Sequence, residues 1–270
     1  MARMLNVGCG ERFHSDWVNL DMNAASPEVI IADLRRGIPF PAGAFDVVYH
    51  SHVLEHLPRP KARDMIVECH RVLKAGGLIR VVVPDLESLA REYLEILRMI
   101  DEGDQRGHRR YDWILIELFD QFVRTRPGGE MIEYLRRRDN PEAEYVIGRI
   151  GPWAAPIMGR DRGAAPPVAP GQTVPITIRL GYFFRSLRLR LTRWRSGTRN
   201  FEQSGERHLW MYDRYSLDRL LAGAGFTDMR VVAHDQSRIP GWADYHLDSD
   251  PDGRPANPGS LYLEAVKTDA

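Results

Sequence analysis

The sequence predicts an α/β fold: a doubly wound, mainly parallel sheet with a helical insertion. Three observations lead to this fold class. Residues 1–85 alternate short apolar stretches with turns and one amphipathic helix, the same pattern returns after residue 206, and the segment between them has helical periodicity. With 270 residues, of which 43% are hydrophobic, the chain is long enough to bury the core that such a sheet needs.

Seven stretches have the length and the apolar pattern of strands. They are residues 4–7, 17–21, 29–33, 45–49, 78–84, 228–234 and 261–267. A helix is expected from Lys61 to Leu73, where apolar residues recur at helical spacing ahead of a Gly-Gly pair. Another is expected from Ser216 to Ala222, because a glycine follows directly. Strands joined by turns and helices in this order pair mainly in parallel.

Residues 86–206 are predicted to be a helical cap inserted into a single domain that consists of residues 1–85 and 207–270. Apolar residues at helical spacing from 86 to 100 and from 113 to 123 indicate two helices in this cap. The sheet is therefore expected to be interrupted after its fifth strand and completed after the insertion.

The second part of the insertion is basic. Residues 151–175 hold six prolines and four glycines, which predicts a loop. Residues 176–195 predict an amphipathic helix whose apolar face is surrounded by arginines, and no acidic residue lies between Gly163 and Asn200. Such a helix suits an anionic membrane surface, and packing on the domain is the alternative. Nucleic acid is not an expected partner, because the arginines lie in one segment and no known nucleic-acid module is present.

Composition excludes several classes of protein. No apolar run approaches the ~20 residues of a membrane span, and the first residues contain no export signal. Cys9 and Cys69 are too few for a disulfide framework or a cysteine-built zinc site. We therefore expect a cytoplasmic protein, with peripheral contact at the inner membrane face if the basic helix binds lipid.

A candidate ligand site lies at the carboxyl ends of the first three strands. The turn Gly8–Gly10 directly follows the first strand, where glycines let the backbone approach a ligand closely. Asp21 ends the second strand and Asp33 the third, and each alone is typical of a turn. Together, the glycine turn and two strand-end acids favour an adenosine-like ligand. A dinucleotide fingerprint is incomplete, because Phe13 stands where its third glycine is required.

Several longer motifs resemble class I S-adenosylmethionine-dependent methyltransferases. They are LNVGCG (5–10), FDVV (45–48), SHVLEHL (51–57) and RVLKAGG (71–77). DWVNLD (16–21) and VPD (83–85) are similar to a bacterial branch often associated with cell-surface polysaccharide and glycolipid pathways. The resemblance implies a Rossmann-like methyltransferase fold, S-adenosylmethionine as the cofactor and a sugar or glycolipid as the acceptor.

The resemblance also implies roles for eight residues as cofactor contacts. They are Gly8, Cys9, Gly10, Asp21, Asp33, Leu34, His50 and Ser51. The glycine turn would line the methionine part of the cofactor, and Asp21 would bind the ribose. Asp33 and Leu34 would border the adenine, and His50 and Ser51 would face the sulfonium. The sequence departs from the family pattern at Asn6, where an acid is usual. Only ten residues separate the glycine turn from Asp21, too few for the usual first helix.

Three histidines follow the fourth strand. A methyltransferase that acts on a hydroxyl must remove its proton, and a histidine suits that role. His52 and His56 are the candidate bases; support of the loop is the alternative, above all for His56. The run His52-x-x-Glu55-His56 also matches a zinc-protease pattern, which requires a continuous helix and a third ligand. The methyltransferase resemblance explains the same residues better, so no metal is predicted.

The predicted function is O-methylation of a sugar carried on a lipid or polysaccharide precursor. His208, Trp210 and Tyr212 are candidate acceptor contacts, with ordinary packing as the alternative role. A small-molecule natural product or RNA is the alternative acceptor. A non-catalytic adaptor with the same fold, docked at a membrane, is the alternative from a different class. The incomplete glycine motif favours it, whereas the strand-end acids and the histidines oppose it.

Overall fold

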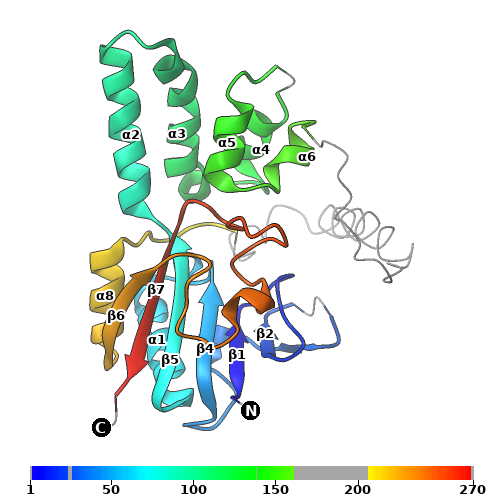
Figure 1. Cartoon of the computed structure of the whole chain (residues 1–270), viewed down its shortest axis with the longest axis vertical. Coiled ribbons are helices and arrows are strands. Elements are labelled where there is room, and N and C mark those ends of the chain that lie inside the picture. Colours follow the sequence, from blue (N-terminus) through cyan, green and yellow to red (C-terminus); the bar gives the residue numbers. More distant parts are fainter. Residues whose placement is uncertain (1, 24–25, 138, 161–205, 269–270) are drawn as a thin grey trace.

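A computed structural model describes residues 2–23, 26–137, 139–160 and 206–268. A sheet with its covering helices forms one part of the molecule, and a group of helices stands beyond one end of the strands (Figure 1). Most of the predicted loop 151–175 and all of the predicted basic helix 176–195 lie outside the described residues.

The sheet has seven strands in the order β3-β2-β1-β4-β5-β7-β6. They are β1 (Met4–Val7), β2 (Val18–Asp21), β3 (Val29–Ile31), β4 (Phe45–Ser51), β5 (Leu73–Pro84), β6 (Phe226–Val232) and β7 (Ser260–Lys267). The first five pair in parallel, and β7 is antiparallel to both of its neighbours. The predicted fold class is confirmed. The strand order reverses between β1 and β4, and ligands bind at such switch points in open α/β sheets.

One face of the sheet is covered by α1 (Arg59–Val72) and α8 (Arg214–Ala222), whose buried side chains share one apolar core with the strands. Asp213 starts α8 with a capping box that includes Ser216. The other face is covered by residues 233–259, the connection between β6 and β7, through an aromatic cluster that includes Trp17, Tyr49 and Trp242. The sheet is thus buried on both faces, as parallel strands require.

A buried arginine joins the sheet to this connection. The Arg80 guanidinium on β5 is fully buried and donates to Asp248 at 2.8 Å and to Glu264 at 2.9 Å. It also lies 4.4 Å from the ring centre of Trp242. Two carboxylates and an aromatic face compensate the buried cation, so the network fixes the connection over the sheet.

The helices beyond the sheet come from the predicted insertion. They are α2 (Leu86–Asp101), α3 (Gln105–Val123), α4 (Gly129–Leu135), α5 (Ala143–Ile150) and α6 (Ala154–Ile157). α3 begins eight residues before the predicted start, because the Asp104 side chain caps it at Arg106 N. Ala154 and Met158 pack into a second core with Trp113, so the start of the predicted loop 151–175 is packed structure. None of the helices in the described ranges has the length and hydropathy needed to cross a bilayer.

Candidate active site

The glycine turn lies at the switch point, directly after β1. Gly8 and Gly10 have φ angles of 68° and 54°, a region that favours glycine. A Cβ on Gly8 would lie 2.5 Å from Val53 Cγ2, whereas nothing lies within 4 Å of the corresponding position on Gly10. The Asp21 carboxylate accepts from Gly10 N at 2.9 Å and from Asn23 N at 2.8 Å. The turn and the acid are therefore held together, and each carboxylate oxygen keeps capacity for a further donor such as a ribose hydroxyl.

The next strand end is more solvent-exposed. Asp33 follows β3 and caps the short helix η1 (Leu34–Arg36). Its carboxylate accepts from Arg35 Nε at 2.8 Å and from Arg35 Nη2 at 3.0 Å, and this side-chain hydrogen bonding lowers the pKa of Asp33. Leu34 is half-buried against the core of the sheet.

The remaining predicted cofactor contacts are more buried. Burial raises the pKa of the Cys9 thiol to about 12, so the thiol is neutral. His50 is fully buried on β4, and neither ring nitrogen has a hydrogen-bond partner within the described ranges. Burial lowers the pKa of His50 to about 4. Ser51 is half-buried at the end of β4.

His52 lies between an acid and a hydroxyl. Its Nδ1 is 3.0 Å from Glu55 Oε1, and its Nε2 is 2.9 Å from Ser260 Oγ on β7. A carboxylate at Nδ1 favours the hydrogen on that nitrogen, so Nε2 presents its lone pair to the hydroxyl. His52 also has a φ of 54°, a value that is uncommon for residues other than glycine. Residues with such backbone conformations cluster at functional sites.

Glu55 is the centre of a histidine cluster. It lies fully buried on the short helix η2 (Leu54–His56). Burial favours a raised pKa, but the contact with His52 outweighs it and lowers the pKa of Glu55 to about 2. Burial lowers the pKa of His208 to about 3.

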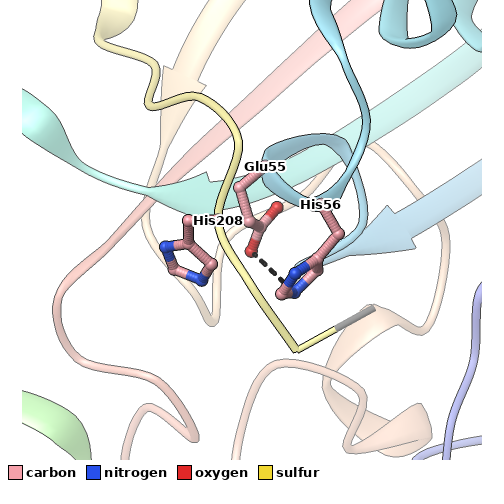
Figure 2. Close-up of side chains that lie close together, drawn as sticks. All are labelled: Glu55, His56 and His208. Carbon is pink, nitrogen blue, oxygen red and sulfur yellow. Dashed lines mark ion pairs between the residues drawn. The ribbon is translucent and has the colours of Figure 1, made fainter. Parts of the chain in front are cut away.

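Residues 207–210 lie across this cluster and hold it in place. Leu209 N donates to the Glu55 carbonyl at 2.6 Å, and His208 N donates to the Gln121 carbonyl of α3 at 2.9 Å. His56 Nδ1 donates to the Arg207 carbonyl at 2.9 Å, which places the ring hydrogen on Nδ1. Figure 2 shows His208 approaching Glu55 and His56 from this segment.

A cavity of about 290 Å³ opens beside the cluster, between the ends of the strands and the helices of residues 86–157. Its polar and aromatic lining includes His52, His56, His208, Glu117, Gln121, Arg149, Trp153, Asn257 and Ser260. Arg149 and Glu117 form an ion pair at 2.8 Å, so this wall carries no net charge. The cavity therefore combines hydrogen-bonding groups, an exposed indole and a histidine whose Nε2 faces a serine hydroxyl.

The three predicted acceptor contacts are not brought together. His208 lines the cavity. Trp210 lies beneath the guanidinium of Arg59, 4.4 Å from its ring centre, and is not part of the cavity wall. Tyr212 is buried in the core of the sheet, and burial raises its pKa to about 12.

Sequence reasoning missed Glu55, Ser260 and Trp153 as parts of the site. Glu55 stood in the quoted motif between two candidate bases, and that spacing was the available signal. No local pattern marks the other two, because β7 and α6 bring them to the cavity from far along the chain.

Residues 5–81, which include β1, the glycine turn, Asp21 and β4, match the profile of a family described as "Methyltransferase domain". The match covers less than a third of the chain, and over these residues the chain is similar to that family. Its reaction is methyl transfer, and its cofactor is S-adenosylmethionine. The sequence prediction of enzyme class and cofactor is confirmed.

The methyltransferase also resembles solved structures. A protein described as a SAM-dependent methyltransferase from Thermotoga maritima is 12% identical, with a TM-score of 0.41 over 99% of this chain and 83% of that one. A SAM-dependent methyltransferase from Archaeoglobus fulgidus is 12% identical, with a TM-score of 0.40 over 98% and 86%. A search of curated proteins finds no match.

Proposed function

We propose that this methyltransferase transfers the methyl group to a hydroxyl of a sugar, carried on a glycolipid or polysaccharide precursor, with His52 as the general base. The observation that carries the proposal is the position of His52. Its Nδ1 faces a buried carboxylate, and its Nε2 lies 2.9 Å from a hydroxyl at the wall of a cavity. That is the arrangement a base needs to take a proton from an alcohol.

The cofactor residues fit S-adenosylmethionine. Open space over Gly10 lets the ligand approach the backbone, and Asp21 offers carboxylate oxygens at the end of β2 for the ribose hydroxyls. Neutral Cys9 adds no charge beside the methionine part. When bound, the cofactor supplies a methyl group on a sulfonium, which is already a good leaving group.

The protein then has two tasks, alignment of the acceptor and removal of its proton. An acceptor hydroxyl would replace the Ser260 hydroxyl at His52 Nε2 and give its proton to that nitrogen. Glu55 acts as a positioning residue, because it holds the ring orientation and stabilises the imidazolium that forms. His56 is placed for support, since its Nδ1 is occupied by the Arg207 carbonyl.

The lining of the cavity supports a sugar-sized acceptor. Its volume is at the low end of small-molecule sites, which start at about 300 Å³. Gln121 and Asn257 offer amide donors and acceptors for hydroxyls, and the Trp153 ring offers an apolar face of the kind sugars stack on. We propose that residues 86–206 act as a cap over this acceptor. Contact of residues 176–195 with an anionic membrane stays a prediction.

The test combines cofactor binding with turnover. Purified protein is titrated calorimetrically with S-adenosylmethionine and then assayed for release of the demethylated cofactor over a panel of free sugars, nucleotide sugars and lipid-linked sugars. His52→Gln should lower kcat by about 10²–10⁴ and leave cofactor affinity unchanged. His108→Gln, on the exposed surface of α3, is the matched control and should keep full activity.

Full turnover in His52→Gln would remove His52 as the base. Turnover only with RNA or with a free natural product would replace the sugar by the alternative acceptors. Failure to bind the cofactor at millimolar concentration would favour the non-catalytic adaptor.

A further inference from the structure

Beside the cavity lies a group of three side chains, of which His56 and His208 line the cavity and Glu55 is buried behind it. Glu55, His56 and His208 each offer one ligand atom, and these atoms all lie within 4.8 Å of one another (Figure 2). We propose that these three residues bind a divalent first-row transition-metal ion. Binding of the ion stands apart from the proposed function, whereas its role at the acceptor rests on it.

The first argument is the buried charge of Glu55. Its side chain is fully buried; Oε1 lies 3.0 Å from His52 Nδ1, and Oε2 has no hydrogen-bond partner among the residues that the structure describes. Within those residues no lysine or arginine pairs with it; the nearest ring nitrogens are His52 Nδ1 at 3.0 Å and His56 Nε2 at 4.0 Å. A buried carboxylate needs a compensating cation or several hydrogen bonds, and one close imidazole is a poor substitute.

The second argument is the tautomer of His56. Its Nδ1 carries the hydrogen that is donated to the Arg207 carbonyl, so Nε2 of the neutral ring has a lone pair. This lone pair lies 4.0 Å from a carboxylate oxygen, too far for a hydrogen bond. Two electron-rich atoms that face each other across this gap favour a cation between them. A backbone carbonyl on the other ring nitrogen is also the usual outer partner of a metal-bound histidine.

The third argument is the way His208 is held. Its backbone N–H is fixed to the Gln121 carbonyl, and the next residue is fixed to the Glu55 carbonyl. Its ring packs edge-on against His56 at 5.0 Å and against Phe122 at 5.9 Å. Zinc–nitrogen bonds of about 2.0–2.1 Å place tetrahedral ligand atoms about 3.4 Å apart, so the three atoms, now within 4.8 Å of one another, would move together by up to about 1.4 Å when the ion binds.

The donor set determines the class of ion. Two imidazoles and one carboxylate suit Zn²⁺, Fe²⁺, Mn²⁺ or Co²⁺, whereas Mg²⁺ and Ca²⁺ prefer oxygen ligands. His56 and His208 line the cavity, so the fourth position of the ion would face the acceptor. There the ion would bind the acceptor hydroxyl and lower its pKa, and His52 would take the proton.

The test measures metal binding without cofactor or acceptor. Protein without an affinity tag is treated with a chelator and titrated with Zn²⁺ by calorimetry, and Co²⁺ binding is followed by its visible absorption. We expect one ion per chain and a rise in Tm. His208→Ala and His56→Ala should each weaken binding at least tenfold, and circular dichroism checks that they fold. His108→Ala, an exposed histidine on α3, is the control for surface binding and should bind as the wild type does.

Two outcomes would overturn the proposal: no saturable binding at millimolar Zn²⁺, or equal binding by the wild type and His208→Ala. His52→Gln separates this proposal from the proposed function, because it should keep the ion and lose methyl transfer. Wild-type protein that binds the ion but methylates no sugar would leave the metal site standing and refute the proposed acceptor.

Discussion

His50 should make the fold sensitive to mild acid. Its imidazole is fully buried, and both ring nitrogens lack partners in the described part of the chain. Burial lowers the pKa of His50 from 6.5 to about 4. As the pH falls, the unfolded chain therefore binds this proton before the folded protein does, and stability is lost between about pH 6.5 and pH 4.

The size of this effect follows from the two pKa values. At pH 5, a histidine with a pKa of 6.5 in the unfolded chain and about 4 in the folded protein lowers the free energy of unfolding by about 2 kcal/mol, against a few tenths at pH 7. His50→Leu removes the titrating group and makes no hydrogen bond unsatisfied. The variant should therefore be close to wild type at pH 7 and more stable by about 2 kcal/mol at pH 5.

Urea unfolding of both proteins at pH 7 and pH 5, followed by tryptophan fluorescence, measures the difference. His208 remains in both proteins, so its titration largely cancels in the comparison. His108→Leu, which replaces an exposed histidine on α3, is the matched control variant for the loss of a histidine. If the difference in free energy of unfolding between wild type and His50→Leu is the same at both pH values, His50 is not a neutral, unpartnered imidazole, and the reasoning is refuted.

Three further predictions concern the site and the core. Asp21→Asn should weaken S-adenosylmethionine binding about 10- to 100-fold by calorimetry, because a charged acceptor for the ribose is lost; unchanged affinity would remove Asp21 from the site. Ser260→Ala should keep kcat within about threefold, because its hydroxyl occupies the acceptor position and is not the base; a loss as large as that of His52→Gln would contradict this. Arg80→Met should cost about 3–5 kcal/mol in urea unfolding, because it leaves two buried carboxylates without their cation; a loss below about 1 kcal/mol would disprove that account.

The sheet could be predicted because each strand carries its own local signal. Residues 4–7 are a short apolar run followed by a glycine turn, and residues 45–49 follow a proline-rich loop. Boundaries shifted where tertiary contacts extend an element: Leu73 joins β5 because it pairs with Phe45, outside the apolar run that indicated the strand. The antiparallel direction of β7 has no local signal, since strand direction depends on the connection and not on the residues of the strand.

Only the part of the candidate site formed by residues that directly follow the strands could be predicted from the sequence. Gly8, Asp21 and His52 follow strand ends, and a sequence pattern can place such residues at one edge of a sheet. His208 reaches Glu55 through hydrogen bonds of the 207–210 backbone, a contact between segments about 150 residues apart that no spacing rule encodes. The sequence predicted no metal, because the methyltransferase resemblance explained the His52–His56 run better than a zinc site did. The sequence could not show whether Tyr212 is buried in the core or lines the cavity, because its burial depends on how α2 and α8 pack against the sheet.

The order of strands in the sheet has a consequence for the synthesis of the protein. β5 lies in the middle of the sheet, yet its neighbour β7 is made nearly two hundred residues later, and the two carboxylates that compensate Arg80 follow it by 168 and 184 positions. Until those residues leave the ribosome, the nascent chain has an open apolar edge and a guanidinium that cannot be buried. The sheet therefore cannot be completed until β7 is made and pairs between β5 and β6, which makes its closure a late step of folding.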